Sequence, residues 1–295
     1  MKKILIIGRK NVGEKNNAFL LAKVISQRSE GLIVDAVYFE DIVLSVTPTS
    51  ATATFTDGSI TDYQTVVMIN WSHDRLYTDV AHSLALIADR AGIAVWNKEL
   101  VTARSSTKIS QLVTLSGHQI PFPHTLFSLT DTILEGYSDQ VGSPFIAKDP
   151  LASRGRNNFL CDDWGAFLRQ IDGSTTHYLL QDFIPNDKTD LRLFVSGGRV
   201  ELAIMRRGGG NTHLNNISQG GQAELVPLET LPETLMTQAE LVAKLFEREL
   251  CGIDFMKNQA TGEYSFLEIN TTPQIVNGAF VDEKAAALAR SLERM

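Results

Sequence analysis

The sequence has few cysteines, no long apolar run and no excess of positive charge. Cys161 and Cys251 are the only cysteines among 295 residues and lack CxxC spacing, which argues against a disulfide framework and a zinc site. No apolar stretch approaches the roughly 20 residues of a membrane helix, and Gly8 interrupts the N-terminal apolar run too early for a signal peptide. The formal net charge of -7 disfavours binding to nucleic acid or anionic lipid. We therefore expect a cytoplasmic protein that binds neither nucleic acid nor a membrane.

The first hundred residues alternate between strand and helix patterns. Residues 3–8 form an apolar strand pattern, and apolar residues then recur at helical spacing as far as Ile25. This order predicts a small open α/β sheet over residues 1–100. Gly8 and Gly13 follow the first strand, but GxGxxG is absent, so turn chemistry is favoured and an NAD site is the alternative.

From Ser105 onward the pattern changes to hairpins and helices. Asp162 is expected to cap one helix, and Pro232 to open a long amphipathic helix that Gly252 ends. Antiparallel strand pairs are predicted at 144–148 with 157–161, at 191–196 with 200–205, and at 252–256 with 266–270.

The last of these hairpins brings three oxygen-bearing side chains together. Opposed residues keep a constant number sum, so a turn centred on Thr261 places Asp254 opposite Glu268. Asn270 shares the face of Glu268 because the two residues are two apart. Two carboxylates this close repel unless a cation lies between them, and all-oxygen ligation suits Mg²⁺ or Mn²⁺. The alternative is a solvated sheet face. The apolar residues expected on the core side are Ile253, Phe255, Leu267 and Ile269.

A cationic loop follows another strand. Lys148 ends that strand, and the loop after it contains Ser153, Arg154, Gly155 and Arg156. Such a loop can lay backbone N–H groups and cations over phosphates. The alternative is a solvated hairpin tip.

Two adjacent arginines follow a third strand. Arg206 and Arg207 come directly after an apolar run. Two guanidinium groups at a strand end can neutralise a transferring phosphoryl group or an acyl phosphate. The alternative is a surface pair that caps the strand.

The order and spacing of these motifs resemble the ATP-grasp ligases of the RimK-like glutamate ligase branch. The resemblance covers residues 96–277, and the opening block resembles the pre-ATP-grasp domain of such proteins. It implies an α/β (α+β) ATP-grasp fold with an N-terminal pre-ATP-grasp open α/β domain. The implied domains are 1–100, 101–184 with the phosphate-covering loop, and 185–295 with the metal site.

The resemblance also implies a role for each matching residue. The hinge from Gln181 to Ile184 resembles the family's Gln-Glu-Tyr-Ile, and its backbone would bind adenine. Asp190 and Arg192 match Asp-x-Arg and imply contacts to ribose and to an acyl phosphate. Catalytic roles are implied for Arg192, Arg206 and Arg207. ATP contacts are implied for Lys108, Lys148, Ser153, Arg154, Gly155, Gln181, Asp182, Phe183, Ile184, Asp190 and Asn216. Metal binding is implied for Asp254, Glu268 and Asn270.

The implied activity is ATP-dependent ligation of a carboxylate to an amine. A substrate carboxylate would attack the γ-phosphate of ATP, giving ADP and an acyl phosphate that the amine then attacks. Two Mg²⁺ or Mn²⁺ ions would bridge the phosphates. The loop at 151–156 would close over ATP and exclude water.

Several identities of substrate and partner are compatible with this chemistry. The acid and the amine are small molecules or peptides. The alternatives are a peptide- or protein-modifying ligase, which forms macrocycles or adds glutamates, and a non-catalytic ATP-binding regulatory protein. A homodimer or tetramer is a reasonable expectation, since most oligomers are symmetric homo-oligomers.

Overall fold

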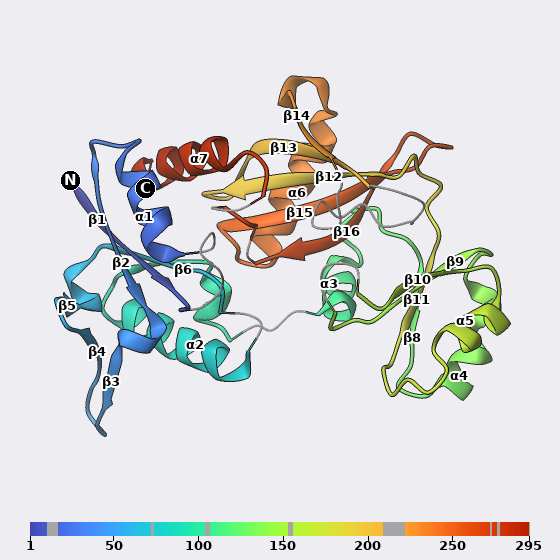
Figure 1. Ribbon diagram of the computed structural model, residues 1–295, viewed down its shortest axis with the longest axis horizontal. Helices are drawn as coiled ribbons and strands as arrows, with labels where there is room; N and C mark the ends of the chain where they lie inside the picture. The colour runs from blue at the N-terminus through green and yellow to red at the C-terminus, as the bar shows by residue number, and fades with distance from the viewer. Residues whose placement is uncertain are drawn as a thin grey trace.

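The computed structural model describes residues 1–10, 17–71, 74–103, 107–152, 156–208, 222–271, 273–275 and 278–294. These residues form three units in a row, with a five-stranded sheet between two four-stranded sheets (Figure 1). No helix within these ranges is long and apolar enough to cross a membrane.

The first unit is an open α/β sheet, as the sequence predicts, and its four main strands run parallel. Helix α1 (Ala18–Ser26) packs on one face and helix α2 (Arg75–Arg90) on the other, so both faces are buried. The parallel strands are, in spatial order, β2 (Leu32–Tyr38), β1 (Lys2–Gly8), β6 (Thr65–Met68) and β7 (Ala94–Trp96). A small antiparallel sheet adjoins them and contains β3 (Val43–Val46), β4 (Ala51–Phe55) and β5 (Gly58–Ser59).

The middle unit is an antiparallel sheet whose core contacts α4 (Asp131–Glu135) and α5 (Trp164–Gln170). Its strands are, in spatial order, β10 (Asn158–Cys161), β9 (Phe145–Lys148), β11 (Leu179–Asp182) and β8 (Thr125–Phe127). The pairing of β9 with β10 confirms the predicted hairpin. The expected cap of α5 was wrong by one residue. Asp163, not Asp162, accepts from Ala166 N at 2.6 Å, because a capping carboxylate must precede that N–H by three residues.

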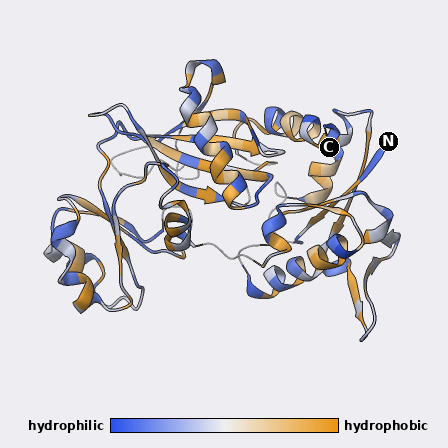
Figure 2. Ribbon diagram, turned by 180° about the vertical axis from the view of Figure 1, so that it is seen from behind, coloured by the Kyte–Doolittle hydropathy of each residue, from blue (hydrophilic) through white to orange (hydrophobic). Residues whose placement is uncertain are grey.

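The third unit is a five-stranded antiparallel sheet whose strands are largely apolar (Figure 2). Helices α3 (Lys108–Leu115) and α6 (Glu233–Leu245) pack on one face, while α7 (Val281–Glu293) packs on the other face and against α1. The strands are, in spatial order, β14 (Gln222–Val226), β13 (Arg199–Arg207), β12 (Thr189–Ser196), β15 (Leu250–Lys257) and β16 (Tyr264–Asn270).

Helix α6 ends earlier than the sequence pattern predicts. It stops at Leu245, and Gly252 lies inside strand β15 rather than after the helix. The chain leaves the helix through Glu247, whose φ is 54°, and Arg248 N donates back to Ala243 O at 2.9 Å. This geometry is a left-handed helix end made without glycine. The expectation that Gly252 ends the helix was therefore wrong.

The last hairpin has the predicted register at the polar positions and a different one at the apolar positions. Asp254 lies opposite Glu268, which confirms the predicted pairing. A β-bulge then shifts the register, so that Phe255 lies opposite Phe266. Phe266 is fully buried, while Leu267, which was expected to face the core, is half-buried. The bulge lets the two phenylalanine rings pack edge to face at 6.1 Å in the core.

Candidate active site

A buried network of two arginines and two aspartates connects three strands of the five-stranded sheet. Arg192 of β12 donates to Asp254 of β15 through Nε and a terminal nitrogen, both at 2.7 Å. Arg206 of β13 contacts Asp190 Oδ1 through Nε at 2.5 Å and Asp254 Oδ2 at 3.0 Å. The cations beside Asp254 are therefore guanidinium groups, where the sequence predicts a metal between Asp254 and Glu268.

These contacts set the proton affinity of the buried carboxylates. Burial alone would raise the pKa of Asp254, but Arg192 and Arg206 outweigh burial and hold its pKa well below the usual range. Burial raises the pKa of Asp190 above its ordinary value, against the opposing effect of Arg206. Asp254 is thus the carboxylate of this network that is most firmly ionised.

The side chains at the end of the last hairpin are the predicted metal ligands, and in this structure both oxygens of Asp254 accept hydrogen bonds from Arg192. Asn270 donates its Nδ2 to Asp254 Oδ2 at 3.3 Å, which joins two of the three predicted ligands directly. Glu268 lies opposite Asp254 on the neighbouring strand. Carboxylate and amide oxygens are the ligands that Mg²⁺ takes in proteins. The part of the chain that the structure describes contains no cluster of three His, Cys, Asp or Glu residues able to hold a metal. The predicted metal site therefore needs Asn270 as its third ligand.

A hydrogen-bonded chain fixes Lys148 in the middle unit. Lys148 Nζ donates to Gln181 Oε1 at 2.7 Å, and Gln181 Nε2 donates to Thr125 Oγ1 at 2.9 Å. Burial lowers the pKa of Lys148 to about 8, an effect that Glu268 opposes and Lys108 adds to. Lys148 on β9 and Glu268 on β16 belong to different sheets, and helix α3, which begins at Lys108, contacts β16.

Other predicted ATP contacts already have partners within the protein. Lys108 Nζ donates to Ala152 O, and Asp182 Oδ1 accepts from Gly142 N at 2.8 Å. The N–H of Asp182 donates to His124 O, and Ile184 O accepts from Asn186, so adenine would have to use other backbone groups of the hinge. Phe183 is half-buried there. The predicted phosphate contacts that lie outside the described residues are Ser153, Arg154, Gly155 and Asn216.

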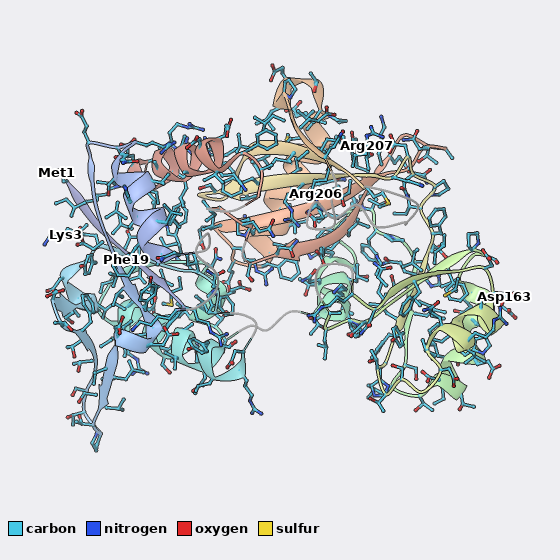
Figure 3. All side chains as sticks on the ribbon, in the orientation of Figure 1. Met1, Lys3, Phe19, Asp163, Arg206 and Arg207 are labelled. Carbon is cyan, nitrogen blue, oxygen red and sulfur yellow. The ribbon has the colours of Figure 1, made fainter. Side chains whose placement is uncertain are left out.

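The two adjacent arginines have different surroundings. Arg206 is buried, whereas Arg207 is exposed at the end of β13 (Figure 3). Strand alternation accounts for this, because neighbouring side chains point to opposite faces.

Lys284 of α7 is a neighbour of the site that the sequence does not mark. It is 3% exposed, and its Nζ donates to Gln274 O. Burial, with Arg192 adding to it, lowers the pKa of Lys284 to about 8. A lysine on an amphipathic helix usually faces water, so no sequence pattern separates this residue from its exposed neighbours.

Solved structures share this arrangement of units. Two structures of the ATP-grasp ligase PsnB are similar to this chain, one complexed with precursor peptide PsnA2 and AMPPNP and one with a minimal precursor, Mg and ADP. Their TM-scores are 0.70 and 0.71, each at 17% identity and each covering 98% of this chain and 96% of the other. The protein therefore has an ATP-grasp fold.

Comparison of the sequence with known proteins identifies the family. Residues 103–287 match the RimK-like ATP-grasp domain, and the chain belongs to that family. It is 28% identical over 205 residues to a probable alpha-L-glutamate ligase of Rhodopirellula baltica, covering 64% of this chain and 49% of that relative. It is 26% identical over 256 residues to the alpha-aminoadipate–LysW ligase LysX of Saccharolobus solfataricus, covering 84% and 86%. The chain thus spans about half the length of the first of these relatives.

Proposed function

We propose that the protein is an ATP-dependent carboxylate–amine ligase that acts through an acyl phosphate. The observation that carries the proposal is the pairing of Asp254 with Glu268 on the last hairpin, beside which Asn270 donates to Asp254 Oδ2 at 3.3 Å. These side chains would hold the metal, and Lys148 would bind the phosphates. Family membership supports the same chemistry.

In this proposal each group has one task. Lys148 and Lys108 offset the negative charge of ATP, and Asp254, Glu268 and Asn270 hold Mg²⁺. Bound Mg²⁺ supplies neutralisation of the phosphate oxygens during transfer. Arg192 and Arg206, which both contact Asp254, steady the acyl phosphate and the oxyanion that forms when the amine attacks, and a catalytic role of Arg207 remains a prediction.

The proposal also covers further ATP contacts, the number of metal ions, the location of the protein and its assembly. ATP contacts by Asp190 and by the hinge at 181–184, the binding of two metal ions, a cytoplasmic location and a homo-oligomeric assembly remain predictions. The domain boundaries after residues 100 and 184 also remain predictions.

A peptide-modifying ligase is the second candidate. The observation that favours it is the likeness to the ATP-grasp ligase PsnB, one structure of which is complexed with a precursor peptide. In the first candidate both substrates are small molecules, whereas here the acid or the amine belongs to a peptide side chain or terminus. A non-catalytic ATP-binding protein is the outcome expected if nucleotide binds without turnover.

A screen for ADP release distinguishes these functions. The protein is incubated with ATP, MgCl₂ and mixtures of acids, amines and acidic peptides, and the products are identified by mass spectrometry. A product whose mass is one water less than the combined mass of an acid and an amine supports ligation. The product mass also shows whether the joined substrates are small molecules or peptides. Tight ATP binding without turnover on any mixture would contradict the ligase proposal.

A further inference from the structure

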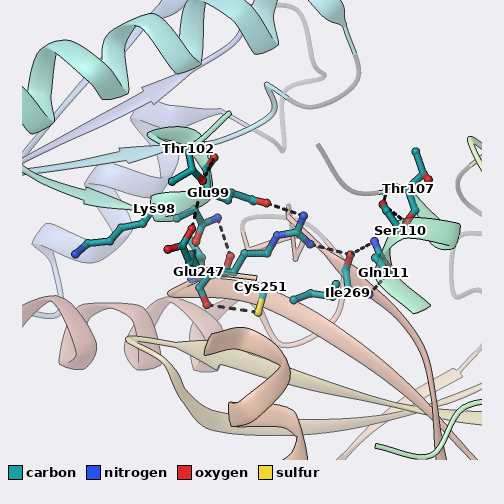
Figure 4. Close-up of polar contacts among 12 residues, drawn as sticks. Lys98, Glu99, Thr102, Thr107, Ser110, Gln111, Glu247, Cys251 and Ile269 are labelled. Atoms are coloured by element: carbon teal, nitrogen blue, oxygen red, sulfur yellow. Dashed lines mark hydrogen bonds and ion pairs between the residues drawn. The ribbon is translucent and has the colours of Figure 1, made fainter. Parts of the chain in front are cut away.

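Ile269 lies between Glu268 and Asn270 on β16, the edge strand of the five-stranded sheet. Its N–H donates to Gln111 Oε1 at 3.1 Å, and its carbonyl accepts from Gln111 Nε2 at 3.2 Å (Figure 4). The carboxamide of Gln111 therefore pairs with both the N–H and the C=O of Ile269, as the backbone of a neighbouring strand would do. The edge of the sheet is closed at this point by a side chain.

A second side chain holds the same carbonyl. Arg248 donates to Ile269 O at 3.1 Å and forms an ion pair with Glu99 at 2.8 Å. Arg248 and Glu99 are 3% and 1% exposed, so this pair is shielded from water and salt. Glu99 belongs to the segment Lys98–Leu100 that follows the first unit. The backbone between Glu268 and Asn270 is therefore held by Gln111 of α3 and by Arg248, which forms an ion pair with Glu99.

The glutamine also connects two parts of the proposed site. Gln111 follows Lys108 by one helical turn on α3, so the two side chains lie on the same side of the helix. Gln111 is 6% exposed and packs beside β16. A shift of α3 along the strand would break both of its hydrogen bonds to Ile269 and would move Lys108 relative to Glu268.

We propose that Gln111 is a positioning residue, which holds Glu268 and Asn270 in place for the metal through the backbone of Ile269. The inference rests on the proposed function, because it assigns Gln111 to the same metal site. Removing a residue that orients a metal ligand typically weakens metal binding by about 10–100-fold. Loss of the Gln111 side chain should weaken metal binding by a factor in this range, although Gln111 is proposed to contact neither the metal nor the substrate.

The test compares Gln111→Met with Gln238→Met. Methionine keeps the length and the helix propensity of glutamine but removes both hydrogen bonds to Ile269. Gln238 of α6 is the matched control, because its Nε2 also donates to a backbone carbonyl, that of Gln119, at 3.3 Å. ADP binding is titrated by calorimetry at increasing MgCl₂, and amide hydrogen exchange is followed in peptides that contain Ile269.

In Gln111→Met, the MgCl₂ concentration for half-maximal ADP binding should rise about 10–100-fold, and the Ile269 amide should exchange faster. Both should stay at wild-type values in Gln238→Met. A Gln111→Met protein with lower Tm but unchanged MgCl₂ dependence would show that Gln111 only stabilises the fold, and the inference would be wrong. If the wild-type protein binds no ADP at any MgCl₂ concentration, the proposed function itself fails and the positioning role fails with it.

Discussion

Arg192 donates two parallel hydrogen bonds to Asp254, each 2.7 Å long. A bidentate pair of this kind fixes the plane of the carboxylate as well as its position. The two residues lie opposite each other on β12 and β15, so the backbone ladder and the side-chain pair reinforce one another. A proposed metal ligand is thereby oriented by a neighbouring strand.

The variant Glu268→Gln tests the metal assignment. Glutamine keeps the shape of the side chain and removes its charge, so substrate-dependent ADP release should fall by about 100-fold or more while Tm changes little. Glu263→Gln, at an exposed position of the same hairpin, is the control. Full activity in Glu268→Gln would contradict the assignment of Glu268 as a metal ligand.

The two adjacent arginines should differ in their effect on stability. Arg206→Met leaves Asp190 buried without its guanidinium partner, which should lower the free energy of unfolding by about 3–5 kcal/mol. Arg207→Met removes an exposed side chain and should change it by less than about 0.5 kcal/mol. Urea unfolding of both variants measures the difference. Equal losses would mean that the buried network does not exist in solution.

Nucleotide binding should depend on pH through Lys148. The pKa of Lys148 is about 8, well below its ordinary value, so the folded protein loses this proton as pH rises through 8 while the unfolded chain still holds it. ADP binding should therefore weaken between about pH 7 and 9, and the contribution of Lys148 to stability should rise over the same range and above it. Lys148→Arg keeps its charge and should bind ADP independently of pH. Parallel pH profiles for the two proteins would exclude Lys148 as the titrating group.

The β-bulge predicts which of two adjacent apolar residues matters for stability. Phe266→Ala removes a fully buried ring that packs on Phe255 and should cost about 3–5 kcal/mol in the free energy of unfolding. Leu267→Ala removes a half-buried side chain and should cost about 1 kcal/mol. Thermal and urea unfolding measure both. A larger loss for Leu267→Ala would mean that the hairpin has the regular register without a bulge.

Local patterns were sufficient to predict most of the elements and one key contact. Strand alternation and the length of the turn give the pairing of Asp254 with Glu268, because both depend only on nearby residues. The open parallel sheet follows from alternating strands and helices for the same reason. These parts of the fold are encoded over short stretches of sequence.

Other features depend on contacts between distant residues. The bulge at Phe255 depends on how two rings pack in the core, and the helix end at Glu247 uses a left-handed residue that is not glycine. The partners of Asp254 come from two strands that are far apart in sequence from it, so no spacing in the chain predicts that Arg192 and Arg206 would neutralise it. The two hydrogen bonds between Gln111 and Ile269 span 158 residues, so no local sequence pattern predicts them.

Helix α7 completes the core of the first unit from the far end of the chain. Leu288 and Leu292 share a core with Ile4 and Leu21, and Lys2 Nζ donates to Glu293 O at 3.2 Å. Synthesis on the ribosome proceeds from the N-terminus and is slow compared with local folding. The parallel sheet and α1 are therefore synthesised long before α7, which packs against α1. During translation α1 can already pack on β1 and β2, but the part of the core that it shares with α7 is complete only after Leu292 has been synthesised.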